Sequence, residues 1–515
     1  MKPDSTYPSP YSRPSCPTTL FQPNHYLHSD LRLQKPALAS SALSQLARSD
    51  SSYSTSGSTL IGSSESCYDK SNTLFPGEQR ALPSAAIKIT KKIRFLTWFN
   101  PYRKLFCVSI LLNSILMIIA IQNLRSYMKR HLSAMVLGNL LIGAMARSEW
   151  VLRLMYWLSV MCFRWKWIPA KLKIWVVGVL YHIGGLHSGC GISALAWLMI
   201  AWVDHLSNRH LYNEVILSSM FFSIFGVLVS CLGALPAVRK AHHNFFEATH
   251  RFIGWFGILA TLIFIISSAW WEPQSRTWQP FAENLVFSQE FWFVLVMILV
   301  TTASWITVVK VPVKFVHTSS KASVIRCGGG VTSGLHTRIS RGGLREWHIF
   351  GAISEGRNSD CHYMVIAVQG DFTGSLNKIQ PSHLYTKIWK PCGLPYFSRL
   401  FQRGVAICTG SGIGAVGSTC IQKESWFLLW IGPDLERTYG IEFMDFIQKN
   451  ISPHRRIIWD TRKSGRPNVP LELERIFLSW NADVALFIGS PTLNKTVLRT
   501  CRARSIPVYG SIWDA

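Results

Sequence analysis

Residues 404–414 read GVAICTGSGIG, a short apolar run followed directly by three alternating glycines. The apolar run predicts a buried β-strand, and the segment after Gly414 predicts a helix. A glycine turn between a strand and a helix lets backbone N–H groups approach a pyrophosphate. We therefore expect Thr409, Gly410, Gly412 and Gly414 to bind a dinucleotide, with a plain β-α turn as the alternative.

Further β-α units follow this stretch. Apolar runs at 426–430, 456–459 and 484–488 are separated by amphipathic segments, a pattern that predicts a parallel sheet. The last run leads into Gly489 and Pro491, which we expect on the same rim as the glycine turn, because nucleotides bind at the carboxyl ends of strands in open α/β sheets. Residues 403–515 are thus predicted to form an NAD(P)-binding α/β domain.

The composition of the 515-residue chain is basic and apolar. Lys and Arg number 53 against 27 Asp and Glu, so the formal net charge is +26, yet charged residues make up only 16%. Hydrophobic residues reach 48%, and there are 21 Trp. This balance excludes a purely soluble enzyme. The 12 cysteines form no Cys-x-x-Cys pair, which argues against a zinc ribbon, an iron–sulfur cluster or a disulfide scaffold.

Six segments have the length and apolarity of membrane-spanning helices. They lie at roughly 105–122, 132–155, 174–203, 215–238, 252–271 and 291–309. The Lys and Arg residues gather in the loops on one side, which the positive-inside rule makes cytosolic together with both termini. We therefore expect a multi-pass integral membrane domain over 105–309. The basic residues are interpreted as topology signals and contacts to the lipid bilayer, not as a nucleic-acid surface.

The regions on either side of the expected membrane domain differ in composition. Residues 1–83 are rich in Ser, Pro and Thr without apolar periodicity, so we expect disorder. Residues 310–402 contain Gly-rich turns and short β-like runs, which predict a β-barrel-like domain. The expected order is therefore a disordered head, a six-helix membrane domain, a β-barrel and an α/β domain.

Motifs after the last span resemble a known family. Glu346-Trp-His-Ile-Phe350, Gly370-Asp-Phe-Thr373 and the glycine turn together resemble the ferric reductase and NADPH oxidase superfamily. The ending at 506–515 and the run at 459–467 look like a fungal subgroup of conidiation-associated transmembrane flavoproteins. The resemblance covers about 94–515 and implies a ferredoxin-reductase-like tail that binds FAD and NAD(P)H.

The resemblance also implies roles for individual residues. It places FAD against four barrel residues, namely Arg338, His348, Phe350 and Thr373. It assigns the nicotinamide dinucleotide to the glycine turn. Trp513, close to the end of the sequence, is a candidate for stacking on the flavin or nicotinamide ring, with a buried structural Trp as the alternative. The chain departs from the family pattern at Ile349 and Gly351, where Pro and Thr or Ser are usual, and Lys390-Pro-Cys-Gly393 is a loose version of the phosphate-side loop. The alternative is an Arg and a His satisfied on a barrel surface.

Four histidines lie in or near the expected spans: His182, His187, His243 and His250. Ionisable groups in a bilayer usually face a cavity or a ligand, and haem iron is often held by His. At about 100° per residue, His182 and His187 cannot both face one partner helix. One haem b held by His182 and His250 is the favoured arrangement, while hydrogen bonds to Glu247, backbone or headgroups are the alternative.

These patterns favour a transmembrane flavin-dependent oxidoreductase. Electrons would pass from NAD(P)H through FAD to an unknown acceptor on the membrane side or across the membrane, because a flavin accepts two electrons and releases them singly. No side chain is needed as a catalytic acid or base. The alternative function is a non-catalytic six-span signalling or scaffold protein with a degenerate reductase tail.

Overall fold

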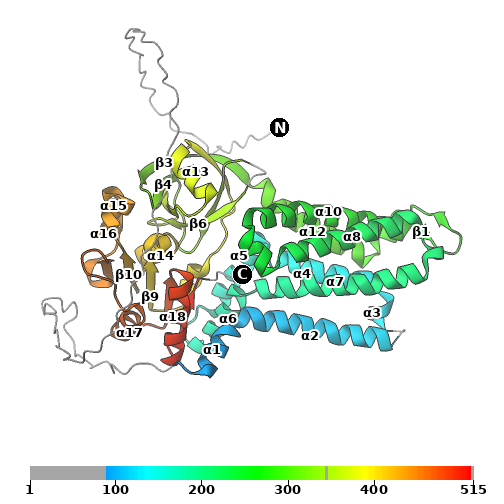
Figure 1. The fold of residues 1–515 in the computed structure, drawn as a ribbon, viewed down its shortest axis with the longest axis horizontal. Helices are drawn as coiled ribbons and strands as arrows, with labels where there is room; N and C mark the ends of the chain where they lie inside the picture. Colours follow the sequence, from blue (N-terminus) through cyan, green and yellow to red (C-terminus); the bar gives the residue numbers. More distant parts are fainter. Residues whose placement is uncertain (1–88, 124–125, 343–345, 512–515) are drawn as a thin grey trace, which may run out of the picture. The chain divides into compact units, whose positions relative to one another are not determined.

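The computed structural model describes residues 89–123, 126–342 and 346–511. The expected disordered head at 1–83 and Trp513 lie outside these ranges. The described residues form a helical bundle, a β-barrel and a parallel α/β sheet, in that order along the chain (Figure 1). We call residues 308–511, which hold the barrel and the sheet, the tail.

The bundle consists of apolar helices that lie side by side (Figure 1). They are α2 (Pro101–Gln122), α4 (Leu132–Met145), α7 (Gly184–Ser207), α8 (Glu214–Gly233), α10 (His243–Trp270) and α12 (Gln289–Ile306). Five of them are long and apolar enough to cross a membrane, and α4 is a shorter apolar helix. At 1.5 Å per residue, the 14 residues of α4 extend about 21 Å, less than a hydrocarbon core of about 30 Å.

Small and amide side chains hold the bundle together. Asn113 Oδ1 accepts hydrogen bonds from Asn139 Nδ2 at 2.8 Å and from Trp197 Nε1 at 2.9 Å, so three helices share one buried polar centre. Gly226 and Gly257 allow α8 and α10 to approach at backbone distance. Close contact at small residues, with buried polar groups paired across helices, is typical of helix packing in membranes.

Two of the expected spans are interrupted, which corrects the sequence-based boundaries. The span expected at 132–155 breaks after α4, and its second half belongs to α5 (Glu149–Phe163). The span expected at 174–203 breaks between α6 (Ala170–Tyr181) and α7. The first break comes directly before Glu149, a buried carboxylate whose partners are in the tail. Lys173, near the start of α6, is also buried and also has its partner in the tail. Helices α5 and α6 therefore form a hairpin that packs on the tail.

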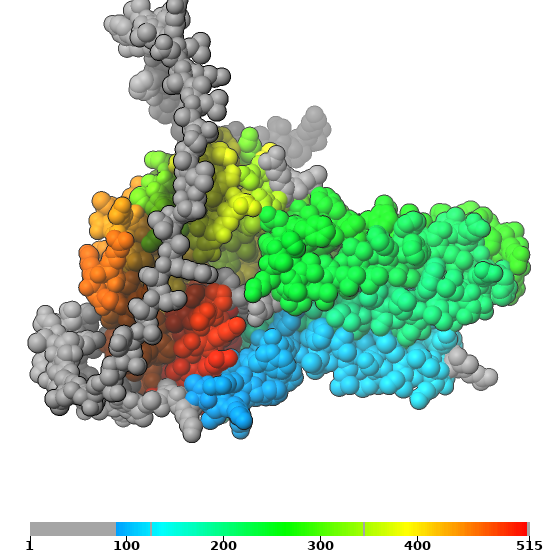
Figure 2. All heavy atoms as spheres, viewed as in Figure 1, coloured from blue at the N-terminus to red at the C-terminus, as the bar shows by residue number. Residues whose placement is uncertain are grey.

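Short elements complete the helical part. They are α1 (Lys91–Trp98), α3 (Tyr127–Arg130), η1 (Arg209–Leu211), α9 (Pro236–Ala241), α11 (Ala282–Val286) and the two-residue strands β1 (Trp271–Glu272) and β2 (Thr277–Trp278). Helix α1 packs against α18 (Pro491–Ala503) of the tail, as Figures 1 and 2 show in blue and red. The start of the described chain thus contacts the sheet domain.

The barrel is closed and antiparallel, with the strand order β3-β4-β7-β6-β5-β8. Its strands are β3 (Val308–Thr318), β4 (Ala322–Gly328), β5 (His336–Ser340), β6 (His348–Ile353), β7 (Cys361–Ala367) and β8 (His383–Lys387). Helix α13 (Asp371–Ile379) inserts Phe372 and Leu376 into a core that also holds Ile325 and Met364. A barrel-like domain was expected here, and the closed sheet confirms it.

The sheet of the α/β part is parallel throughout, with the strand order β11-β10-β9-β12-β13. Its strands are β9 (Gly404–Thr409), β10 (Trp426–Gly432), β11 (Arg456–Asp460), β12 (Val484–Ile488) and β13 (Val508–Gly510). The helices and 3-10 turns of this part are η2 (Leu394–Leu400), η3 (Gly410–Gly412), α14 (Ile413–Gln422), α15 (Leu435–Tyr439), α16 (Ile441–Asn450), η4 (Pro453–Arg455), α17 (Val469–Ser479) and α18. Separate hydrophobic cores cover the two faces, which explains the continuous apolar runs in the sequence.

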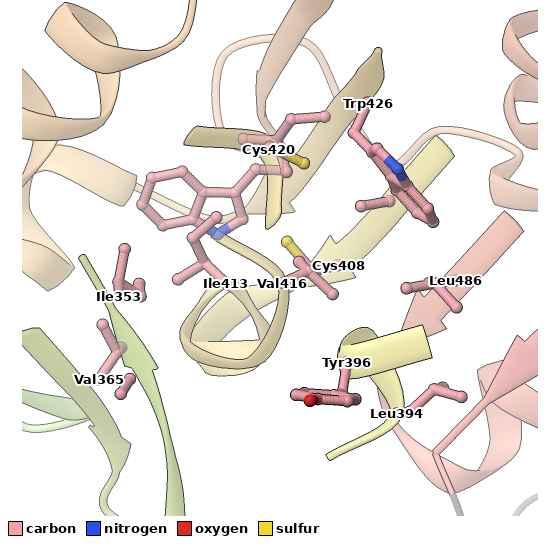
Figure 3. Close-up of a cluster of buried hydrophobic side chains, with 14 of the residues drawn as sticks. Ile353, Val365, Leu394, Tyr396, Cys408, Ile413, Val416, Cys420, Trp426 and Leu486 are labelled. Carbon is pink, nitrogen blue, oxygen red and sulfur yellow. The ribbon is translucent and has the colours of Figure 1, made fainter. Parts of the chain in front are cut away.

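Helix α14 joins the sheet to the barrel. Ile413 and Val416 of α14 belong to one cluster with Ile353 and Val365 of the barrel strands and Leu486 of β12 (Figure 3). The cluster also includes η2 and the α5–α6 hairpin. Barrel, sheet and hairpin therefore share a single hydrophobic core, which fixes the glycine turn at the start of α14 relative to the barrel.

Substitution of Gly185 tests the close packing of α2 and α7. A Cβ atom at Gly185 would lie 2.1 Å from the backbone oxygen of Tyr102, whereas a Cβ at Gly191, on the same helix, meets no atom within 4 Å. Gly185→Ala should therefore destabilise the protein by about 1–3 kcal/mol, and Gly191→Ala should leave its stability unchanged or slightly higher. Thermal unfolding of the detergent-purified chain measures both, and equal melting temperatures would contradict the packing.

Candidate functional site

The glycine turn lies where the strand order of the sheet reverses. From β9 the chain moves outward through β10 to β11, and then returns to the other side of β9 with β12. Ligands of open α/β sheets bind at such a switch point, outside the carboxyl ends of the strands. The two expected loops meet there: a Cβ at Gly412 would lie 2.9 Å from the backbone oxygen of Ile488, and one at Gly489 would lie 3.0 Å from Thr409 Oγ1.

The local geometry of the turn suits a phosphate. Gly410 has φ +56°, a left-handed conformation that favours glycine. Its carbonyl oxygen accepts a hydrogen bond from the indole Nε1 of Trp430, at 2.9 Å, which holds the turn against β10. Helix α14 then begins without a side-chain cap, and the N-terminus of a helix favours an anion.

Charged residues follow the neighbouring strands on the same rim. The carboxylate of Asp460, at the end of β11, accepts hydrogen bonds from the backbone N–H groups of Asp434 and Arg462, at 2.9 and 2.8 Å. Burial alone would raise the pKa of Asp460, but these donors outweigh it and hold the pKa below its usual value. Arg462 Nη1 lies 3.4 Å from Asp434 Oδ2, and 62% of the Arg462 side chain is exposed.

The residues that the family resemblance assigns to FAD are divided between two faces of the barrel wall. In the β5–β6 register His348 lies opposite Ile339, and Arg338 lies opposite Ile349. Directly opposed residues of antiparallel strands point to the same side of the sheet. His348, with the ring of Phe372 at 4.2 Å, therefore lies on the side of the barrel core, and Arg338 lies on the outer side.

The other flavin-assigned residues also have partners within the barrel. Phe350 packs against the barrel core. His348 Nε2 lies 3.4 Å from Glu346 Oε2. Thr373 Oγ1 accepts hydrogen bonds from the backbone N–H groups of Gln369 and Gly370, at 3.0 and 3.1 Å, and so caps the start of α13. His348 and Thr373 thus lie near each other beside Phe372, whereas Arg338 is on the opposite side of the wall.

The barrel and the helix α14 are in direct backbone contact at one point. A Cβ at Gly351 of β6 would lie 2.1 Å from the backbone oxygen of Gly414, so α14 rests directly on β6. Arg338 Nε lies 2.9 Å from the buried carboxylate of Glu149 in α5. The flavin-assigned residues of this chain therefore do not form a cradle for FAD in this arrangement.

The histidines of the bundle are paired differently from the expectation. His187, not His182, approaches His250, with ring centroids 6.1 Å apart in an edge-to-face contact. His187 Nδ1 lies 2.9 Å from the backbone oxygen of Gly143, and His182 Nδ1 lies 2.8 Å from that of Gly178. His243 is next to Phe246. The two rings that the structure brings together in the bundle are therefore those of His187 and His250, and not those of the favoured pair His182 and His250.

The described ranges 89–123, 126–342 and 346–511 contain no group of three or more His, Cys, Asp or Glu side chains that could hold a metal ion.

Sequence reasoning missed the residues of α5 that contact the barrel, namely Glu149, Trp150, Arg153 and Tyr156. Their signal was a Glu and an Arg four residues apart inside an apolar segment. Charges with this spacing share one side of a helix and need partners there.

The tail thus has the barrel-plus-parallel-sheet architecture expected of a ferredoxin-reductase-like protein, with a dinucleotide-type glycine turn at its switch point. Residues 394–515 match the family model described as Adenylate-forming reductase 03009, C-terminal domain. Relatives of the chain are adenylate-forming reductases of the fungus Coprinopsis cinerea.

Adenylate-forming reductase 06235 is 28% identical over 485 residues, which cover 90% of this chain and 46% of that protein. Adenylate-forming reductase 03009 is 30% identical over 431 residues, which cover 81% of this chain and 40% of that protein. The chain therefore spans less than half the length of these curated relatives.

Solved reductases align with part of the chain at low similarity. The ferredoxin reductase in carbazole 1,9a-dioxygenase is 12% identical, with a TM-score of 0.31, over 39% of this chain and 69% of that chain. Phthalate dioxygenase reductase is 12% identical, also with a TM-score of 0.31, over 40% of this chain and 67% of that chain. At this similarity the strand order and register of the tail itself, and not the alignments, define its architecture.

The buried histidine of the barrel predicts acid sensitivity of the tail. Burial lowers the pKa of His362 to about 4, and its Nδ1 lies 2.6 Å from the backbone oxygen of Gly329. The pKa of this histidine is about 6.5 in the unfolded chain and about 4 in the folded chain. At a pH between these two values, the unfolded chain binds a proton that the folded chain does not. Stability should therefore fall, by on the order of 3 kcal/mol, as the pH drops through this window, and should be unaffected by this group above it.

The measurement is the melting temperature of the full chain as a function of pH. His362→Gln should reduce the fall between about pH 6.5 and 4 without abolishing it, because burial also lowers the pKa of His336 to about 4. His383→Gln, at the exposed start of β8, should retain the full fall. An unchanged profile in His362→Gln would contradict the assignment.

Proposed function

We propose that the chain is a membrane-bound oxidoreductase that binds a nicotinamide dinucleotide at the rim formed by β9 and β12. The observation that carries this proposal is the contact of Gly412 with Ile488, because it brings the glycine turn and the β12 loop together at the switch point. The curated relatives are named reductases. Hydride transfer from a nicotinamide requires positioning more than acid or base catalysis.

The rim suggests how the dinucleotide lies. The pyrophosphate would bind at the N-terminus of α14, and the nicotinamide would extend towards Gly489 and Pro491 after β12. The adenosine ribose would then lie over the end of β10, near Asp434 and Arg462. An Asp at this place accepts a hydrogen bond from the 2′-hydroxyl of NADH, and an Arg donates hydrogen bonds to the 2′-phosphate of NADPH. The exposed Arg462 favours NADPH.

The membrane part of the proposal follows from the apolar helices. Helices α2, α4, α7, α8, α10 and α12 would make six crossings, with the short α4 spanning a locally thinned bilayer. Both termini, the hairpin and the tail would then share the cytosolic side, in agreement with the positive-inside pattern. The electron acceptor is a group that meets the nicotinamide directly, or FAD in an arrangement other than the one described above.

A specific observation also favours the second candidate function, a non-catalytic membrane scaffold or sensor. The flavin-assigned residues are divided between two faces of the barrel wall and have partners within the chain. A protein of this kind would still bind a dinucleotide at the rim but would not oxidise it. Binding and oxidation of NADPH by the purified full chain therefore distinguish the two functions.

Gly410→Ala should weaken NADPH binding about tenfold or more, because a Cβ in the left-handed region costs about 1–2 kcal/mol and shifts the turn. Gly465→Ala is the matched control, since Gly465 has φ +71° but meets no atom within 4 Å and lies outside the glycine turn. Titration of the full chain with NADPH, followed by nicotinamide fluorescence, measures both variants. If the wild-type chain binds neither NADPH nor NADH, the proposed function is wrong.

A further inference from the structure

We infer that helix α5 is a built-in cover over the outer face of the barrel around Arg338, so that the chain with α5 docked holds no flavin on that face. This inference concerns the barrel, not the β9–β12 rim, and it stands or falls separately from dinucleotide binding. The evidence is a set of contacts from one side of α5 to the segment that runs from β8 through η2.

The residues of α5 that touch the tail share one side of the helix. Glu149, Trp150, Arg153 and Tyr156 are spaced at i, i+1, i+4 and i+7, which places them along one stripe. Glu149 is 8% exposed and Tyr156 is 6% exposed. A stripe of this kind, with a charge at one end and an aromatic ring at the other, indicates a helix that docks on protein over its full length, not one that faces lipid all round.

An ion cluster fixes the first turn of α5. The carboxylate of Glu149 lies 2.9 Å from Arg338 Nε and 3.4 Å from Lys387 Nζ. Lys387 is itself buried between the rings of Trp305 and Trp347. Removal of one member of a buried ion pair costs several kcal/mol, because the remaining charge loses its partner. Arg338, which the family resemblance places against the flavin, is therefore paired with Glu149 of α5.

An aromatic stack covers the loop after β8. The indole rings of Trp150 and Trp389 are nearly parallel, with centroids 4.2 Å apart and an interplanar angle of 7°. The guanidinium of Arg153 lies 4.1 Å from the Trp389 ring centroid, and its Nη1 donates a hydrogen bond to the backbone oxygen of Lys390 at 3.2 Å. Lys390–Gly393 is the loop that the family resemblance assigns to the flavin phosphates, and Arg153 holds its first residue.

The far end of the hairpin extends the cover to η2. The ring of Tyr156 lies 4.3 Å from that of Phe397, and Lys173 Nζ of α6 donates a hydrogen bond to the backbone oxygen of Leu400 at 2.9 Å. The buried lysine thus has a backbone partner in the tail. Contacts from α5 and α6 therefore follow the chain continuously from Lys387 to Leu400.

The opposite side of α5 is apolar and exposed. Leu154, Leu158 and Met161 are 53%, 43% and 48% exposed. The hairpin connects α4 to α7 of the bundle, so α5 directly follows one apolar helix in the sequence and α6 directly precedes another. We assign the exposed side of α5 to the lipid surface, where helices with one apolar side lie in the plane of the membrane. Lipid on one side and the tail on the other would keep α5 docked.

The first experiment measures flavin in the full chain purified in detergent. The protein is dialysed against excess FAD, passed through a desalting column and denatured, and the released flavin is quantified by fluorescence. We expect flavin far below one equivalent per chain. About one equivalent retained by the wild-type chain would overturn the inference, and NADPH titration of the same sample reports on the rim separately.

The second experiment tests the docked position of α5 directly. In the double variant Arg153→Cys, Trp389→Cys, a short bismaleimide should join the two introduced cysteines. The link is detected as a shift in the sizes of the fragments after protease digestion. Leu154→Cys combined with Trp389→Cys is the matched control, because Leu154 is one residue further along and faces the other side. Each single variant controls for the native cysteines. Cross-linking of the Arg153 pair without cross-linking of the Leu154 pair supports the docked position of α5. Equal cross-linking of both pairs, or cross-linking of neither, overturns it.

Discussion

The backbone contact between Gly351 of the barrel and Gly414 of α14 determines how the two halves of the tail meet. A side chain at Gly351 would collide with the oxygen of Gly414 at 2.1 Å, so helix and strand can approach this closely only because Gly351 lacks a Cβ. The contact places the glycine turn at the start of α14 beside the barrel.

A second constraint, the buried carboxylate of Glu149, decides what the α5–α6 hairpin does. In lipid this charge would be costly, but Arg338 and Lys387 of the barrel neutralise it. The chain therefore breaks two apolar segments and turns the hairpin onto the tail. Arg338 and Lys387 of the barrel thereby hold the first turn of α5 in place.

Local chemistry explains which features the sequence predicted well. The strands of the parallel sheet and the turn at Gly410 follow from apolar runs and glycine conformations within a few residues. The break at Glu149 could not be predicted, because its partners Arg338 and Lys387 are far along the chain and hydropathy averages over one charge. The sequence did not show which histidine of the third span lies beside His250, because that depends on the end of α6 at Tyr181, after which the structure places His187 next to His250.

The most direct measurement is an electron cryomicroscopy structure of the full chain in a lipid nanodisc with NADPH and FAD both present. The account predicts density for a dinucleotide at the N-terminus of α14, with α5 against Trp389 and no flavin density along the barrel. A flavin ring lying between the barrel and α14, or a dinucleotide bound away from the switch point, would contradict it.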